Sequence, residues 1–256
     1  MGVVALSATD AVGRGLNAGT AVRSTGIVVA LATEAATIAA RSVKPGAAEL
    51  ADGALLWLGG MGPAAAQYAA EQLADADCAA LAVFGVAGAL SPHLRNGMLY
   101  CPERVLDGNG REYVADAAWR RHLQQLLGPS LHTEGTLLGS ASPLLTAAAK
   151  TAAHGRFGAL AVDMESAAVA AVAHQRGLPF VVLRAIVDEV DDAIPVALND
   201  SVDAWGRPRP LHLVGALARH PSLLGELPRL YSRMQRATRA LRTAASAAGP
   251  ALGWQR

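Results

Sequence analysis

Five short apolar runs constrain the fold more than any other feature of this sequence. They are Gly26–Leu31, Ala54–Leu58, Ala79–Phe84, Ala159–Val162 and Phe180–Val187. Each run is continuously apolar, which is typical of strands buried on both faces of a parallel sheet. Alanine-rich segments with helical spacing lie between them, such as Pro63–Leu73 and Met164–Arg176, and the second stops at Gly177. We therefore predict a single-domain, three-layer α/β protein in which helices cover both faces of a mostly parallel sheet.

The composition excludes several classes of protein. With 52% hydrophobic and 17% charged residues among 256, the sequence predicts a large core. The net charge of +1 provides no basic field for nucleic acid, and no apolar run approaches the roughly 20 residues that cross a bilayer. Cys78 and Cys101 lie outside any metal-binding pattern, which favours reduced thiols in a cytoplasmic protein without a metal site. Residues 1–24 lack the pattern of a signal peptide, and we expect a flexible extension before one domain over residues 25–248.

Glycines and carboxylates follow the predicted strands, at the edge where open α/β sheets bind ligands. In chain order they are Glu34, Gly59–Gly62, Gly85–Gly88, Asp163, Glu165 and Asp188. Neither glycine segment fits the GxGxxG or P-loop pattern, which disfavours a dinucleotide coenzyme. The sequence therefore predicts a site built from two glycine loops and four carboxylates.

The fourth strand is followed by two carboxylates at the start of a helix. A carboxylate there is favoured by the helix dipole, and for Asp163 capping of the helix is the favoured interpretation. Glu165 has a second use together with Met164. A methionine can press its thioether onto a sugar face while the glutamate accepts protons from the sugar hydroxyls.

The fifth strand carries a spaced pair of charged residues. Alternate residues of a strand face one way, so Arg184 and Asp188 share a face, with Cα atoms roughly 13 Å apart. This spacing suits two ends of a nucleoside, with Asp188 at the base and Arg184 nearer the attacking side of the sugar. A surface ion pair between the two is the alternative, which the apolar surroundings disfavour.

These motifs resemble those of the methylthioadenosine/adenosylhomocysteine nucleosidases and their hexameric nucleoside phosphorylase relatives. V-D-M-E-S-A-A at Val162–Ala168 is similar to the family's V-[DE]-M-E-x-A-A segment, and R-A-I-V-D at Arg184–Asp188 to R-A-I-S-D. The run Gly26–Glu34 resembles the family's opening strand, G-I-I-G-A-M-E-E-E. The resemblance covers about residues 26–192 and implies an enzyme that cleaves the N-glycosidic bond of a purine nucleoside.

The resemblance implies a role for each of these residues. Asp188 protonates the purine at N7, and Glu34 positions and deprotonates the attacking water. Arg184 completes the catalytic group, Met164 packs against the sugar, and Glu165 binds the ribose hydroxyls. A solvent-facing position at the start of a helix stays the alternative for Glu34.

The same resemblance implies further substrate contacts. The segment F-G-V-A-G-A-L resembles the family's T-G-S-A-G-G-L, whose backbone approaches the sugar and the nucleophile, and Val86 stands at the serine position. In the base-binding segment, Ser142 and Pro143 replace a phenylalanine and an aliphatic residue. The substrate-binding residues are thus expected to be Met164, Glu165, Gly85, Val86, Ala87, Ser142, Pro143 and Ala30.

The nucleophile stays open between water and phosphate. Phosphate needs several cationic donors, and Arg184 is the evident one, whereas Glu34 would repel a dianion. Hydrolysis without a cofactor is favoured, with inorganic phosphate as the alternative co-substrate. The F-G-x-A-G-x-L segment and G-R-P-R-P-L at Gly206–Leu211 resemble the hopanoid-associated phosphorylases, which implies adenosylhopane as substrate and adenine as leaving base. A methylthioadenosine/adenosylhomocysteine nucleosidase and an inactive nucleoside-binding module are the alternatives.

A basic amphipathic helix is expected at about residues 222–248. Its apolar stripe comprises Leu230, Tyr231, Met234, Thr238 and Leu241, with Pro228 in the first turn and arginines around the other side. Packing on its own sheet or on a partner subunit is the favoured interpretation, and a position in an anionic membrane surface is the second. We expect a cytoplasmic homo-oligomer, with a dimer favoured, that binds a small-molecule or lipid nucleoside. A peripheral contact at the inner membrane face belongs to the second interpretation of the helix.

Overall fold

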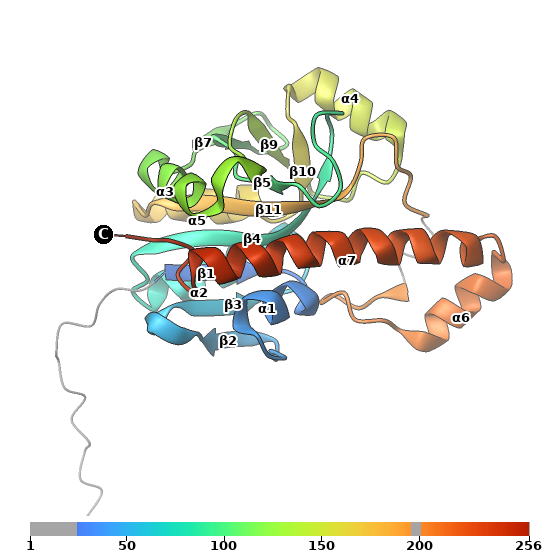
Figure 1. Ribbon diagram of the computed structural model, residues 1–256, viewed down its shortest axis with the longest axis horizontal. Coiled ribbons are helices and arrows are strands. Elements are labelled where there is room, and N and C mark those ends of the chain that lie inside the picture. Colours follow the sequence, from blue (N-terminus) through green and yellow to red (C-terminus); the bar gives the residue numbers. More distant parts are fainter. Residues whose placement is uncertain (1–24, 196–200, 256) are drawn as a thin grey trace, which may run out of the picture.

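The computed structural model describes residues 25–195 and 201–255 (Figure 1), so the expected extension at 1–24 lies outside the described residues. The helices are α1 (Ala32–Ala39), α2 (Pro63–Asp75), α3 (Ala117–Leu127), α4 (Ala147–Phe157), α5 (Ser166–Arg176), α6 (Pro210–Arg219) and α7 (Leu223–Ala248). Short 3-10 helices lie at η1 (Ala51–Gly53) and η2 (Gly128–Ser130). The strands are β1 (Thr25–Val29), β2 (Gly46–Glu49), β3 (Leu55–Leu58), β4 (Ala80–Ala89), β5 (Leu99–Tyr100), β6 (Arg104–Leu106), β7 (Glu112–Val114), β8 (Leu131–His132), β9 (Thr136–Gly139), β10 (Ala161–Asp163) and β11 (Phe180–Asp188).

All these strands join in one mixed sheet. Its main order is β2-β3-β1-β4-β10-β9-β6-β7, while β11 pairs with β4 and β5, and β5 pairs with β8. The central strands β3, β1, β4 and β11 run parallel to one another, whereas β10 runs antiparallel to β4, β2 to β3 and β5 to β11. The predicted α/β class is confirmed, and the five predicted apolar runs correspond to β1, β3, β4, β10 and β11.

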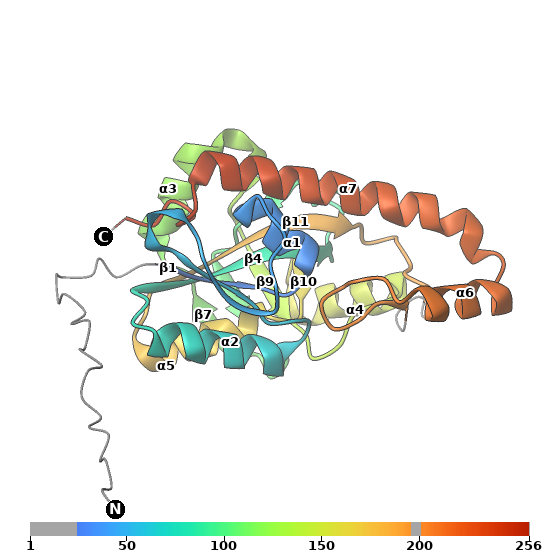
Figure 2. The same cartoon turned by 90° about the horizontal axis from the view of Figure 1, so that it is seen from below.

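Helices cover both faces of the sheet, which gives the three predicted layers (Figure 2). Residues of α2 and α5 pack into one apolar cluster with the inner positions of β4 and β11. Residues of α1, α3 and α7 pack into a second cluster on the opposite face. As predicted, α5 ends at Gly177, whose left-handed φ of 65° is costly for other residues.

Strand β4 differs from the prediction because it does not stop at Phe84. It continues to Ala89, so Gly85–Gly88 belong to a strand and do not form a loop. The continuation is possible because β4 changes partners, pairing with β1 up to Val83 and with β10 at Gly88. The short strands β2 and β5–β9 were not predicted, since runs of two to four residues carry little periodicity.

The C-terminal helix α7 lies along the sheet, and its second half is embedded in the core. Ala237, Leu241 and Ala244 are fully buried there, which confirms packing on the chain's own sheet for this half. The helix begins at Leu223, so the prediction that Pro228 lies in its first turn was wrong, and this proline is inside the helix. None of the described helices is long and apolar enough to cross a membrane.

Candidate active site

A cavity of about 230 Å³ lies where β1, β10 and β11 end, against the second half of β4. All the predicted site residues line it except Arg184 and Gly85. Those that line it are Ala30, Glu34, Val86, Ala87, Ser142, Pro143, Met164, Glu165 and Asp188. The strand-end rule therefore brings together residues that are up to 158 positions apart in the chain (Ala30 to Asp188).

Glu34 is buried at the first turn of α1 and faces the cavity. Its carboxylate accepts hydrogen bonds from the backbone N–H groups of Ala30 (3.1 Å), Leu31 (2.8 Å) and Val86 (2.7 Å). Burial raises the pKa of Glu34 to about 7, although Arg184 and two of these N–H groups oppose the rise. The side chain is 2% exposed, so the solvent-facing alternative is wrong. A fixed carboxylate that ionises near neutral pH is suited to act as a general base.

Gly85 lies behind the cavity wall, between Glu34 and Arg184. A β-carbon at this position would overlap the Glu34 carboxylate and lie 2.6 Å from Arg184 Nη1. Only glycine therefore allows the two charged groups to approach each other. Gly85 was predicted to contact substrate, but the structure gives it this spacing role instead.

Arg184 also differs from its predicted position. It is 1% exposed and lies beneath the cavity, where its guanidinium binds Asp163 (Nε to Oδ2, 2.8 Å) and Glu165 (Nη2 to Oε2, 3.0 Å). The expected alternation fails because β11 bulges between Ile186 and Asp188. The surface-pair alternative is wrong as well, since Arg184 and Asp188 have different partners. Arg184 orients Asp163 and Glu165 and lies close to Glu34 across Gly85, but it does not itself line the cavity.

The Met164–Glu165 turn is held from two directions. Glu165 Oε1 accepts the N–H of Gly62 (3.0 Å), at the start of α2, and Oε2 accepts Arg184. Asp163 Oδ1 accepts the N–H groups of Glu165 (3.3 Å) and Ser166 (3.1 Å), which confirms the predicted capping role. Burial raises the pKa of Glu165, which the Arg184 guanidinium opposes. The first glycine segment, Gly59–Gly62, thus contributes to the site through the backbone N–H of Gly62, which orients the Glu165 carboxylate.

Lys150 is a site residue that the sequence analysis missed. It is the buried residue of α4, is 1% exposed, and lines the cavity beside Asp188. Its ammonium binds Asp188 Oδ2 and the carbonyl oxygens of Glu189 (2.8 Å) and Asp192 (3.1 Å). A lone lysine in an alanine-rich helix gave no sequence signal of this pairing. Gly88 also contacts the carboxylate, since a β-carbon there would lie 3.0 Å from Asp188 Oδ2.

Apolar side chains complete the cavity, and most of them were also missed. They are Leu31, Met61, Leu144, Val162, Val187 and Ile194. The hydrogen bond from Ile194 N to Leu145 O (2.9 Å) joins the segment after β11 to the base-binding segment predicted around Ser142. Within the described residues, no group of three or more His, Cys, Asp or Glu side chains is placed to hold a metal ion.

The arrangement gathers four carboxyl groups and one lysine in a cavity lined mostly by apolar side chains. A family model described as the phosphorylase superfamily matches residues 25–218. The chain belongs to the phosphorylase superfamily. As a member, it is an enzyme that cleaves N-glycosidic bonds. A search of curated proteins finds no significant match.

Solved structures with the same fold are similar over most of the chain. A methylthioadenosine/adenosylhomocysteine nucleosidase from Neisseria meningitidis, in complex with methylthio-immucillin-A, has 18% identity and a TM-score of 0.63, covering 88% of this chain and 98% of that one. Futalosine hydrolase of Helicobacter pylori has 16% identity and a TM-score of 0.62, covering 86% and 95%. A nucleosidase from Helicobacter pylori with butyl-thio-DADMe-Immucillin-A has the same identity and TM-score, covering 86% and 96%. At these identities the likeness shows the fold.

Proposed function

We propose that this enzyme hydrolyses the N-glycosidic bond of an adenine nucleoside. The observation that supports this best is the convergence of three differently held carboxyl groups on one cavity. Glu34 ionises near neutral pH, Glu165 is oriented by Arg184 and Gly62, and Asp188 is paired with Lys150. These are the groups that water activation, sugar binding and base protonation require.

The reaction divides between the two ends of the nucleoside. Asp188 delivers a proton to N7 as the C1′–N9 bond breaks and its electron pair passes to the purine. Glu34 takes a proton from the water whose oxygen bonds to C1′. Glu165 holds the ribose hydroxyls, and the carboxylates around the sugar stabilise the positive charge that develops on it.

The charges around the cavity favour water over phosphate. Of the described residues that line it, Lys150 is the one cation, against Glu34, Asp163, Glu165 and Asp188. Lys150 is already bound to Asp188, and Arg184 to two other carboxylates. A phosphate dianion would therefore meet like charge without a free cationic donor.

We further propose adenosylhopane as the substrate. The F-G-x-A-G-x-L and G-R-P-R-P-L motifs support this assignment, and the apolar wall that includes Leu31, Met61 and Ile194 suits an apolar group on the ribose. The cleaved product would be a ribosyl hopane. The runner-up is a methylthioadenosine/adenosylhomocysteine nucleosidase, and an inactive nucleoside-binding module is the alternative outside enzymes.

The test measures adenine release from adenosylhopane in mixed micelles, and from methylthioadenosine and adenosine, with and without inorganic phosphate. We expect adenosylhopane to give the highest kcat/KM. The ribosyl product should carry a hydroxyl group on C1′, and the rate should not depend on phosphate. A phosphate requirement would overturn hydrolysis. A higher kcat/KM for methylthioadenosine would establish the runner-up, and binding of all three without adenine release would establish the inactive module.

We also propose a peripheral membrane contact made by α6 and the start of α7, and a homodimer as the assembly. Four apolar side chains there are exposed: Leu211 (86%), Val214 (64%), Leu224 (60%) and Tyr231 (68%). These helices project together from the body of the molecule (Figure 1). Exposed apolar groups beside arginines suit an anionic lipid surface.

The proposed homodimer is tested separately. Light scattering after size-exclusion chromatography gives the mass of the assembly directly, and a monomeric mass would contradict the dimer.

A flotation experiment tests the membrane contact. We expect the full chain to float with vesicles of anionic lipid at low salt, and the triple variant Leu211→Ser, Leu224→Ser, Tyr231→Ser to remain in solution. Truncation of α7 is unsuitable, because its second half is part of the core. Val114→Ser is the matched control, since Val114 is 73% exposed on β7, away from these helices. Equal flotation of the triple variant, or none by the wild type, would contradict the proposal.

A further inference from the structure

The position of Asp188 depends on the segment that follows it, here named the acid loop (residues 188–192). Asp188 is the last residue of β11, directly after the bulge at Val187, so no sheet hydrogen bonds continue beyond it. The loop is held by side chains instead. Asp192 Oδ2 accepts the N–H of Glu189 (2.7 Å), which closes the loop on itself.

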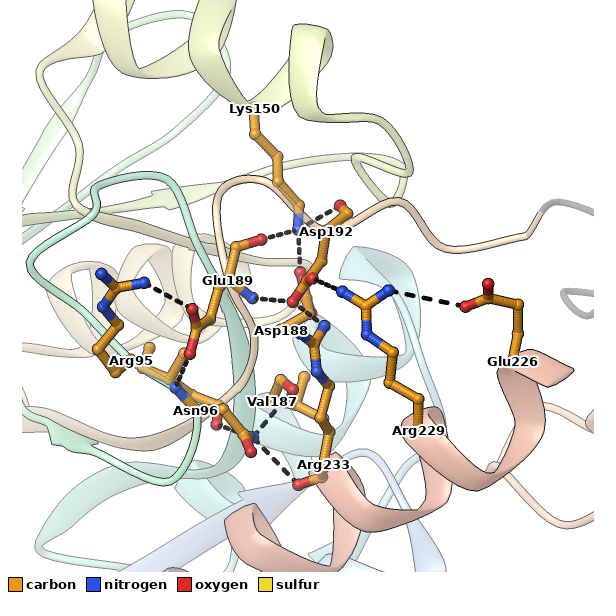
Figure 3. A network of polar contacts seen from close by, with 11 residues as sticks. Arg95, Asn96, Lys150, Val187, Asp188, Glu189, Asp192, Glu226, Arg229 and Arg233 are labelled. Atoms are coloured by element: carbon orange, nitrogen blue, oxygen red, sulfur yellow. Dashed lines mark hydrogen bonds and ion pairs between the residues drawn. The ribbon is translucent and has the colours of Figure 1, made fainter.

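The Asp192 carboxylate is bound by two arginines of α7 (Figure 3). Arg229 Nη2 lies 2.6 Å from Oδ1, and Arg233 forms an ion pair with Oδ2. Asp192 is 4% exposed and the Arg233 side chain is 18% exposed. The ion pair between Arg233 and Asp192 is therefore shielded from solvent more than an ordinary surface pair. The sequence predicts arginines on the side of the helix away from its apolar stripe, and the structure gives two of them, Arg229 and Arg233, a buried carboxylate as partner.

The other sides of the acid loop are held as well. Lys150 binds Asp188 together with the carbonyls of Glu189 and Asp192. Asn96 Nδ2 lies within hydrogen-bond distance of the carbonyls of Val187 (3.0 Å) and Arg233 (3.1 Å), so it joins the bulge to the backbone of α7. In Figure 3 these groups surround the loop, with Lys150 on one side and the arginines on the other.

We propose that α7 is a positioning element for the proton donor, acting through the contact of Arg229 and Arg233 with Asp192. The inference rests on the proposed function, since it takes Asp188 to be the group that protonates the base. Displacement of a reacting group by about 1 Å can lower a rate by on the order of 100-fold. A loop held by side-chain contacts beyond the end of its strand is therefore sensitive to loss of one partner, although Asp192, Arg229 and Arg233 do not line the cavity.

The experiment compares two substrates that differ in their need for an acid. Adenosine releases adenine, which must be protonated to leave readily, whereas 4-nitrophenyl β-ribofuranoside releases 4-nitrophenolate, which departs as a stable anion. For Arg233→Gln and Asp192→Asn, we expect kcat on adenosine to fall 10- to 100-fold with KM changed less than threefold, and turnover of the nitrophenyl riboside to stay within threefold of wild type. The double variant should lose no more than Asp192→Asn alone, because both substitutions remove the same contact.

Arg239→Gln is the matched control, since Arg239 is an exposed arginine of the same helix. It should leave both activities unchanged. Hydrogen exchange supplies a readout that does not depend on catalysis, and Arg233→Gln should speed exchange in the peptide covering 186–195 while the second half of α7 stays protected. Unchanged adenosine turnover in Arg233→Gln, equal losses on both substrates, or unchanged exchange in the acid loop would each overturn the proposal.

Failure of the proposed function would look different. If wild-type enzyme cleaves the nitrophenyl riboside but no adenine nucleoside, the proposed function fails, and the exchange result still decides whether α7 holds the loop.

Discussion

Asp188→Asn is expected to lower kcat on adenine nucleosides by on the order of 10²- to 10⁴-fold, because only the acid can deliver a proton to N7. Binding of a substrate analogue should change little, since the amide keeps the size of the carboxyl and its oxygen can still accept from Lys150. Steady-state kinetics and calorimetry of analogue binding measure the two quantities separately. Turnover near the wild-type rate would remove Asp188 from the mechanism.

The same substitution has a structural cost that must be separated from the catalytic one. Lys150 and Asp188 are 1% and 9% exposed at the side chain, and breaking such a buried pair lowers the free energy of unfolding by about 3–5 kcal/mol. Denaturant unfolding of the variant should show a shift of this size while the protein stays folded at 25 °C. The nitrophenyl riboside serves as the control for an intact cavity, since its cleavage needs no proton from Asp188.

Glu34→Gln is the second change with a large expected effect. It should lower kcat/KM on the order of 10²- to 10⁴-fold, because it removes the general base.

The raised pKa of Glu34, about 7, also predicts the pH dependence of the wild-type enzyme. The base form exists above this pKa and is lost as the pH falls through it. The contribution of Glu34 to kcat/KM should therefore be constant above about pH 7.5 and fall about tenfold per pH unit below about 6.5.

The variant provides its own control for this assignment. Because the amide does not titrate, the fall around pH 7 should be absent from its residual activity. A fall at the same pH in Glu34→Gln would assign the titration to another group. Glu71→Gln is the matched control, since Glu71 is on the outer part of α2, where it binds Gln67. It should leave both the rate and its pH dependence unchanged.

The sequence was sufficient for the fold class and for most of the residues that line the candidate site. Continuous apolar runs identify strands buried on both faces, because an unpaired polar side chain there would be costly, and five such runs became β1, β3, β4, β10 and β11. Residues that follow parallel strands meet at one edge of the sheet, so Glu34, Glu165 and Asp188 could be brought together without a structure. The apolar runs and the residues that follow them are local patterns, and local patterns can be identified in a sequence.

Only the tertiary structure decided which charged groups face each other. The partner of Asp188 is Lys150, 38 residues away, and that of Glu165 is the N–H of Gly62, 103 residues away. Periodicity assigns a side chain to a face of its own strand or helix but contains no information on what packs against that face. The bulge in β11 moved Asp188 off the face that Arg184 occupies, and the docking of α7 brought Arg229 and Arg233 to Asp192. Ion-pair partners are selected by the packing of remote elements, because a buried charge is stable only where the assembled fold provides its counter-charge.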